Sequence, residues 1–353
     1  MAYLEISNIS IRGIAAAVPK TVVKTLDGYS PKWGKVEDFI ASTGILERHV
    51  SNPDQCTSDL CVASAEKLID NLGWSKDEIE AVVFVTQTPD FLCCPATACN
   101  IQHRLGLSTN CLAFDINLGC SGWVYGLSVL ASMMQNGCIK KGLLLAGDTA
   151  TKHNSKNDGS ATPLFGDAGT ATALEYDTNN NSTIKFTLHS DGSGWDAIVI
   201  REGGYRNPFN EHSLESKYFG EGHFHKGIEV EMDGMSVFSF AITKVPKSIK
   251  KLMTVSNLND EDIDILTLHQ ANRMINDIIV KKININPTKM EESLSLYGNT
   301  SSASIPLTLV TKSAKNLRTS KVCHLVSGFG VGLSWGAAIF QTNNIVVPEL
   351  IEI

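Results

Sequence analysis

Cys120 lies in the segment AFDINLGCSGWVYG, where an apolar, strand-like run passes into a helix-like one. Its neighbours Gly119, Ser121 and Gly122 are small, which lets a substrate approach the sulfur. The N-terminus of a helix stabilises a thiolate through its unpaired N–H groups and its dipole. The pattern therefore indicates a nucleophile, although a cysteine among apolar residues is also the usual pattern of a core residue.

Two more side chains with useful chemistry stand at similar junctions. His269 lies in LHQAN and Asn299 in YGNTSSASIP, each after an apolar stretch and before a predicted helix. An imidazole and a carboxamide can each donate a hydrogen bond to a thioester oxygen, which stabilises the enolate left when a malonyl group loses carbon dioxide. Each residue alone also fits a structural role, as a buried histidine or a helix cap.

The surrounding chain alternates between strand and helix patterns. Apolar runs at 81–88 and 142–147 predict strands and the stretch 120–134 predicts a helix, so we expect an α/β protein. DILTLHQANRMIND repeats the order strand, polar turn and amphipathic helix seen around the cysteine, which indicates an internal duplication. We predict two halves, residues 1–177 and 178–353, packed so that both turns face one cleft.

The alternation stops between residues 195 and 226. Glycines, Pro208 and scattered aromatic residues replace it, and the segment is unusually long for a loop. Two interpretations stay open, a surface excursion without a role and a cap over the site.

Composition narrows the class of protein. The 353 residues are 43% hydrophobic and 19% charged, enough for one or two packed domains. The start, with Arg12 inside its apolar run, predicts a first strand rather than a signal peptide, and no run approaches about 20 uninterrupted apolar residues. A net charge of -7 argues against broad nucleic-acid binding.

Nine cysteines without paired CxxC spacing predict no zinc site. We expect a cytoplasmic protein without a metal or membrane anchor.

Four segments, DINLGCSGWVYGL, LHQANRMI, YGNTSSASIP and GFGVGLSWG, occur in an order that resembles the ketoacyl-acyl-carrier-protein synthase III family of the thiolase superfamily. STGILERHV at 42–50 and LFGDAGTATAL at 164–174 are also similar to it, and the resemblance extends to about Phe340. It implies a thiolase fold of two duplicated α/β halves in α-β-α-β-α layers, and a homodimer. The implied substrates are coenzyme A or phosphopantetheine thioesters, with no cofactor.

The resemblance also implies a role for each matching residue. Cys120 would take a starter acyl group, and His269 with Asn299 would activate a malonyl group on acyl carrier protein for decarboxylative Claisen condensation. The backbone N–H groups of Cys120 and Val331 would form the oxyanion hole. Phe329 would border the cysteine and shield the cavity.

The substrate entrance departs from the family pattern. Members that use coenzyme A starters carry a tryptophan and an arginine there, whereas this chain has Phe39 slightly displaced and Ser42 at the arginine position. Lys152 matches another basic position at the nucleotide.

Cys94 stands where the family has a bulky residue that reaches the partner's acyl tunnel, which predicts a longer pocket unless Leu92 refills the space. The length of the starter, its carrier and the pathway stay open.

Two basic clusters could receive an acidic carrier protein. We predict docking for the first, which lies on the helix after the histidine, and interpret the second as an ordinary solvated helix face. The first cluster is Arg273, Lys281 and Lys282, and the second is Lys244, Lys247, Lys250 and Lys251.

Two alternative activities share parts of this pattern. Papain-like hydrolases also order their residues as Cys, His and Asn, but their cysteine lies near the mature N-terminus rather than after a strand-rich half. An acyltransferase that passes the acyl group to an alcohol or amine would need no decarboxylation. The presence of Asn299 favours condensation over such a transfer.

Overall fold

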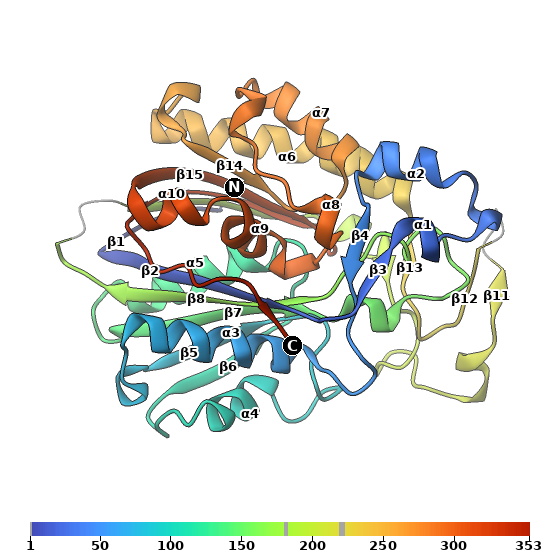
Figure 1. The fold of residues 1–353 in the computed structure, drawn as a ribbon, viewed down its shortest axis with the longest axis horizontal. Helices are drawn as coiled ribbons and strands as arrows, with labels where there is room; N and C mark the ends of the chain where they lie inside the picture. Colours follow the sequence, from blue (N-terminus) through green and yellow to red (C-terminus); the bar gives the residue numbers. More distant parts are fainter. Residues whose placement is uncertain (1, 180–182, 219–222) are drawn as a thin grey trace.

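The computed structural model describes residues 2–179, 183–218 and 223–353. Two β-sheets lie roughly parallel, with helices between them and on both outer faces (Figure 1). The expected α/β class and the five layers α-β-α-β-α are confirmed. Within the described residues, none of the helices has the length and apolar character needed to cross a bilayer.

The first sheet has six strands in the order β17-β2-β8-β7-β5-β6. β5, the run AVVFV, is buried at every position, as expected for a strand with covered faces. β6 pairs only with β5 and forms one edge of the sheet. The strands are β2 (Ile9–Val18), β5 (Ala81–Val85), β6 (Leu112–Ile116), β7 (Lys141–Asp148), β8 (Ala168–Tyr176) and β17 (Ile351–Glu352).

The second sheet has five strands in the order β1-β9-β16-β15-β14. Its core repeats the pairing of the first sheet. In the second sheet β14 pairs in parallel with β15, and the pairs β15–β16 and β16–β9 are antiparallel. In the first sheet β5 pairs in parallel with β7, and the pairs β7–β8 and β8–β2 are antiparallel. This pattern establishes the duplication. The strands are β1 (Ala2–Ser7), β9 (Thr183–Ser190), β14 (Ile265–Leu268), β15 (Lys321–Gly330) and β16 (Ser334–Asn343).

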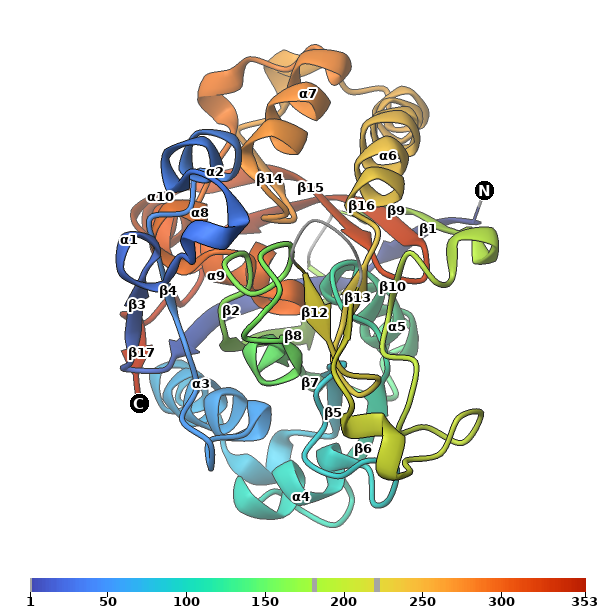
Figure 2. The ribbon, with the colours of Figure 1, turned by 90° about the vertical axis from the view of Figure 1, so that its right-hand side faces the viewer.

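The helices fall into three layers (Figures 1 and 2). α5 (Gly122–Met134) and α9 (Ser304–Lys312) lie between the sheets and are mostly buried. α3 (Thr57–Leu72) and α4 (Thr97–Arg104) cover the first sheet, whereas α6 (Gly234–Ser256) and α7 (Arg273–Ile283) cover the second. The remaining helices are α1 (Thr25–Gly28), α2 (Val36–Thr43), α8 (Leu294–Tyr297) and α10 (Ala314–Thr319).

Three buried apolar clusters match these layers. The largest lies between the sheets around Trp123 and Leu127 of α5, and the other two lie beneath α6 and α3. Gly126 lets α5 approach the first sheet, since a Cβ atom there would come within 2.6 Å of Leu144 and 2.7 Å of Val85. Tight packing of α5 fixes the position of its N-terminal end, and Cys120 lies two residues before it.

Two sequence interpretations need correction. The single first strand is two strands in different sheets, separated by Asn8, whose φ of 65° an asparagine tolerates. The helices that follow Cys120 and His269 are not equivalent, because α5 lies in the central layer and α7 in an outer one. The structural counterpart of α5 is α9, which follows Asn299.

The excursion at 195–226 is built from short paired strands. β10 pairs with β13, and β11 pairs with β12. Two side-chain contacts tie it together, a bidentate ion pair between Arg201 and Glu231 and a bond from Lys217 to Glu202. Residues 219–222 of this segment lie outside the described residues. The strands are β10 (Ile198–Val199), β11 (Lys217–Tyr218), β12 (Phe224–His225) and β13 (Glu231–Met232).

A separate strand pair lies near the N-terminus, outside this excursion. It is formed by β3 (Val22–Lys24) and β4 (Glu47–His49).

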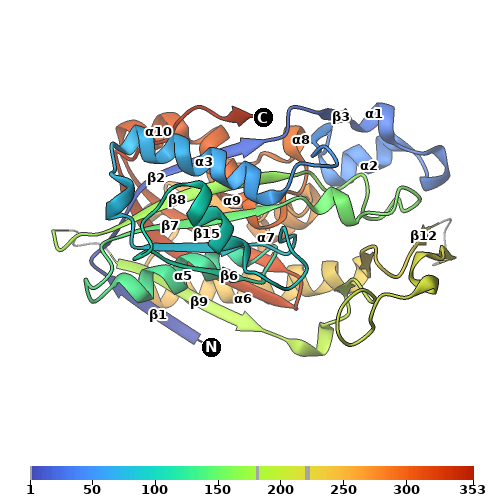
Figure 3. The same ribbon diagram turned by 90° about the horizontal axis from the view of Figure 1, so that it is seen from below.

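Both chain ends cross between the halves. β1 joins the sheet of the C-terminal half, while β17 pairs with β2 in the first sheet. The view from below shows the strands of both sheets running along the long axis of the molecule (Figure 3). The halves are therefore joined by backbone pairing as well as by side-chain packing.

Candidate active site

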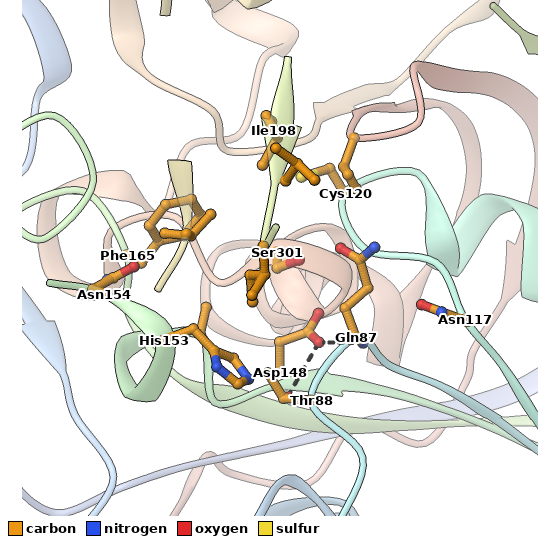
Figure 4. Close-up of a pocket in the computed structure, with 15 residues that line it drawn as sticks. Gln87, Thr88, Asn117, Cys120, Asp148, His153, Asn154, Phe165, Ile198 and Ser301 are labelled. Atoms are coloured by element: carbon orange, nitrogen blue, oxygen red, sulfur yellow. Dashed lines mark hydrogen bonds between the residues drawn. The ribbon is translucent and has the colours of Figure 1, made fainter. Parts of the chain in front are cut away.

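Cys120 stands two residues before α5, at the edge of a cavity of about 380 Å³ (Figure 4). The residue is partly exposed toward that cavity, although its sulfur is enclosed by protein. The cavity has a polar and an apolar set of lining residues. The polar set is Gln87, Thr88, Asn117, Asp148, His153, Asn154 and Ser301, and the apolar set is Ala150, Phe165, Ile198, Val199, Ile200, Val230 and Val331.

The glycine-rich turn of the second half lies directly against the cysteine. A Cβ atom on Gly330 would come within 2.7 Å of the Cys120 sulfur, and one on Gly328 within 2.9 Å of its carbonyl oxygen. Only glycine permits this approach. It brings the backbone N–H of Val331 to the sulfur, and the family resemblance implies that this N–H is an oxyanion-hole donor.

The thiol is kept protonated near neutral pH. Burial raises the pKa of Cys120 to about 11, and the negative charge of Asp148 acts in the same direction. Hydrogen bonds from the N–H groups of Val331 and Cys120 and from the Ser301 side chain lower it in part. Attack on a thioester therefore requires that the proton be removed as the reaction proceeds.

His269 follows β14 and is buried, with 1% of its surface exposed. Its Nδ1 lies 2.8 Å from Oγ of Ser304, the first residue of α9, and its ring packs edge-on against Phe329. Burial lowers the pKa of this imidazole to about 3, and a backbone hydrogen bond with Ser301 opposes that effect. The ring is thus neutral over the physiological range.

Asn299 is buried at the junction of the halves. Its backbone N–H donates to Leu164, and its carbonyl accepts from Gly166 of the segment that precedes β8. Its side-chain Oδ1 accepts from the N–H of Ser301 at 3.0 Å. Ser301 is thus bonded to Asn299 and lines the same cavity as Cys120.

Asp148 ends β7 and is 1% exposed. Its Oδ1 accepts from the backbone N–H of Gln87 and the hydroxyls of Thr86 and Thr88, and Oδ2 accepts from the N–H and hydroxyl of Ser302. Burial is the main cause that raises the pKa of this carboxyl, and the hydrogen bonds oppose it. A carboxylate with so many donors is firmly fixed in place.

The excursion contributes to one wall of the cavity. Ile198, Val199 and Ile200 line it, together with Val230, the residue before β13. The N–H of Val230 donates to the carbonyl of His153, which joins this wall to the segment after β7. Much of the rest points outward, with Tyr205 91% exposed.

The residues expected to meet the substrate are not among those that line this cavity. Phe329 is buried against His269, and Phe39 packs on the ring of Tyr29. Lys152 is exposed and donates to the carbonyl of Pro53. Cys94 is exposed in the irregular segment between β5 and α4. None of these four residues lines the cavity within the described part of a single subunit.

The basic residues of α7 differ in their availability. Arg273 is paired with Glu292 at 2.6 Å, and its guanidinium lies over Gly44. Lys281 and Lys282 are exposed at the end of the helix, and Lys282 donates to the carbonyl of Ile242 on α6. Lys282 shares a shallow surface depression with two residues of the second cluster, Lys247 and Lys250.

Sequence reasoning missed two residues at the centre of the site, Asp148 and Ser301. The signal for Asp148 was an acidic residue at the end of the apolar run GLLLAG, since buried charge at a strand end commonly marks a site. Ser301 gave no comparable signal, because it follows Asn299 in a run of small polar residues whose backbone path the sequence does not reveal.

The duplicated layers, with a cysteine at the start of a central helix, define a condensing enzyme of the thiolase superfamily. Residues 114–192 match the family model "3-Oxoacyl-[acyl-carrier-protein (ACP)] synthase III", and residues 253–342 match the model of its C-terminal part. The chain belongs to the 3-oxoacyl-[acyl-carrier-protein] synthase III family, and the expected transferase class is confirmed.

Individual relatives agree over nearly the whole length. The chain is 36% identical to a β-ketoacyl-[acyl-carrier-protein] synthase III of Streptococcus agalactiae, covering 94% of this chain and 98% of the relative. It is 34% identical to the protein of that name from Prochlorococcus marinus, with 94% and 96% covered. The crystal structure of a 3-oxoacyl-(acyl-carrier protein) synthase from Burkholderia xenovorans superposes with a TM-score of 0.92 at 32% identity, covering 100% and 99% of the two chains.

Proposed function

We propose that the protein transfers a starter acyl group from a thioester to Cys120 and condenses it with a malonyl group on acyl carrier protein. The observation that carries this assignment is that Cys120 lines a cavity together with Ser301, which is bonded to Asn299, while His269 is bonded to Ser304 of the same segment. Acyl transfer to an alcohol or amine and Cys-His-Asn hydrolysis are not favoured by the family to which the chain belongs.

The two half-reactions use different groups. The N–H groups of Val331 and Cys120, which face the sulfur, would bind the oxyanion during acyl transfer and condensation. The neutral imidazole of His269 and the carboxamide of Asn299 would donate hydrogen bonds to the malonyl thioester oxygen as carbon dioxide leaves. Both donors are uncharged, so neither adds charge that would oppose approach of the malonyl carboxylate.

The carrier protein would dock beside α7. Lys281 and Lys282 are exposed there, and Lys247 and Lys250 of α6 extend the same basic surface. This surface contrasts with the net charge of -7 for the whole chain, and such contrast steers an acidic partner. Because Arg273 is held by Glu292, we assign it a smaller part in docking than the lysines.

A homodimer is part of the proposal. β6 is an edge strand whose residues are exposed or half-buried, and Leu112 at its start is 43% exposed. Leu92, near the position where Cys94 would reach the partner, is 83% exposed. Pairing across this edge would cover both. A cytoplasmic location is also proposed, supported by nine cysteines that are all free.

Intact-protein mass spectrometry after incubation with acyl thioesters of increasing length tests the assignment. The wild-type protein should gain one acyl mass on the peptide that contains Cys120, and Cys120→Ser should gain none. His269→Ala and Asn299→Ala should still be acylated while malonyl decarboxylation falls by roughly 10²-fold or more. Normal condensation by either alanine variant, or acylation of Cys120→Ser, would exclude these roles.

A further inference from the structure

The cavity beside Cys120 has a polar wall that the proposed chemistry does not use. Four side chains of this wall follow β5, β6 and β7, which are parallel neighbours in the first sheet. The carboxyl ends of parallel strands meet at one edge of a sheet, where ligands of α/β proteins commonly bind. The four side chains are Gln87 after β5, Asn117 after β6, and His153 and Asn154 after β7 (Figure 4).

The carboxamide of Asn154 is enclosed and unpaired. Its Nδ2 and Oδ1 are both buried, and neither has a hydrogen-bond partner in the described part of the chain. Buried polar groups in proteins are nearly always hydrogen-bonded. This carboxamide must therefore find its donor and its acceptor in whatever fills the cavity. A hydrocarbon chain would leave both atoms unpaired at a cost in binding, whereas a hydroxyl or keto oxygen would satisfy them.

Gln87 offers a second carboxamide close to the reacting sulfur. A Cβ atom on Gly119 would come within 2.3 Å of the Gln87 Oε1, so this side chain lies over the residue before Cys120. Figure 4 shows its amide group on the side of Cys120. Gln87 is thus placed to meet an oxygen substituent near the thioester end of a bound acyl group.

The cavity has no positive charge that would hold an ionised starter. Asp148 is acidic, and both of its carboxyl oxygens already accept hydrogen bonds from the protein. Lysine and arginine are absent from the described lining, and burial lowers the pKa of His153, which keeps its imidazole neutral. A carboxylate on the acyl chain would lie near a second acidic group without a cation to offset it. The polar wall therefore favours neutral substituents.

The remaining wall is apolar and the space is large. Ile198–Ile200 and Val230 of the excursion contribute hydrocarbon surface. The cavity volume of about 380 Å³ compares with about 30 Å³ for one molecule of liquid water. An acyl group well beyond two carbons fits this space. The best match to both walls is a chain with an apolar body and oxygen atoms along one side.

We propose that the starter is an acyl chain longer than acetyl that carries a neutral hydroxyl or keto oxygen beyond its carbonyl, bound by the carboxamides of Gln87 and Asn154. Each carboxamide can donate to a keto oxygen through its N–H groups or accept from a hydroxyl through its oxygen. This inference rests on the proposed function, because it names the substrate class of the same cavity.

The first test compares thioesters that differ only in one oxygen. N-acetylcysteamine thioesters of octanoic, 3-hydroxyoctanoic and 7-hydroxyoctanoic acid are mixed with the protein, and acylation of Cys120 is followed by rapid quench and mass spectrometry. At least one hydroxylated thioester should react about 10-fold or more faster than octanoyl, because the alkyl chain leaves a buried carboxamide unpaired. Acylation by octanoyl as fast as by both hydroxylated thioesters would overturn the inference.

The second test replaces each carboxamide by an apolar group of similar size. Gln87→Leu and Asn154→Leu should each lower the preference for a hydroxylated thioester by about 10-fold, in part by speeding octanoyl acylation. Ile198→Ala is the matched control, because it enlarges the apolar wall of the same cavity. It should change all three rates together and leave their ratios near the wild-type values. A wild-type preference retained by both leucine variants would also overturn the inference.

A structural role for Asn154 gives a different result. Because its carboxamide bonds to no described residue, Asn154→Leu should unfold at a urea concentration equal to or above that of the wild type. A marked loss of stability would assign the side chain to the fold and overturn its part in binding.

Binding of unreactive amides separates the preference of the cavity from the chemistry of the cysteine. Calorimetry should show tighter binding of 3-hydroxyoctanamide or 7-hydroxyoctanamide than of octanamide, and equal binding of all three would count against the inference. Failure of the proposed function looks different, because Cys120 would then be acylated by none of the thioesters while the preference among the amides remained.

Discussion

Ser304 offers a direct test of how the site holds its histidine. Its Oγ lies 2.8 Å from Nδ1 of His269, and both side chains are buried. Ser304→Ala removes this partner and leaves a buried ring nitrogen without a hydrogen bond, which costs about 1–3 kcal/mol. If the transition state for decarboxylation needs the ring in its present orientation, the same energy appears as a roughly 5- to 150-fold slower reaction.

The assay follows carbon dioxide release from malonyl thioester by enzyme already acylated on Cys120. Acylation itself should be unaffected, and unfolding in urea should show a loss of stability of about 1–3 kcal/mol. Thr311→Ala is the matched control, since it removes a hydroxyl on the same helix that bonds only to backbone carbonyls. Unchanged decarboxylation by a folded Ser304→Ala protein would refute the idea that Ser304 positions the imidazole.

Three further predictions concern pH, chain length and docking. Burial lowers the pKa of His269 to about 3, so decarboxylation by the acyl-enzyme should show no inflection between about pH 5 and 8; a step centred near the ordinary histidine value would contradict this. Cys94→Phe should shorten the longest starter accepted in an acylation series from two to about twelve carbons, because each excluded methylene forfeits about 0.8 kcal/mol of burial, and an unchanged length profile would place Cys94 away from the tunnel. Lys281→Glu with Lys282→Glu should raise KM for malonyl-acyl carrier protein and leave malonyl-coenzyme A unaffected, whereas equal effects on both substrates would argue against docking there.

Sequence patterns predicted the α/β class because the central strands are continuous apolar runs, whereas the order of the layers was implied by the family resemblance. AVVFV at 81–85 and GLLLAG at 142–147 are both buried strands, as expected. The boundary at Asn8 was missed, because one residue with a positive φ separates two strands of similar composition. The assignment of α7 as the counterpart of α5 also failed, since both segments share a local pattern and differ only in the layer where they pack.

The site was predictable where chemistry depends on residue type and obscure where it depends on backbone path. Cys120, His269 and Asn299 were named from their types and settings, and the structure bonds Asn299 to Ser301 and His269 to Ser304, with Ser301 beside Cys120 in one cavity. Ser301 could not be found from sequence, because its place depends on a left-handed turn, and its neighbour in the cavity, Asp148, lies 153 positions earlier in the chain. Contacts between distant segments of this kind leave no periodic signal.

The crossing of the two chain ends has a consequence for synthesis on the ribosome. β1 is made long before its partner β9, about 180 residues later, and β2 lacks its β17 neighbour until residues 351–352 are made. Pairings of such long sequence separation are slow to form. A nascent N-terminal half therefore carries an unpaired leading strand during most of its translation, and neither half expressed alone would have every strand of its sheet.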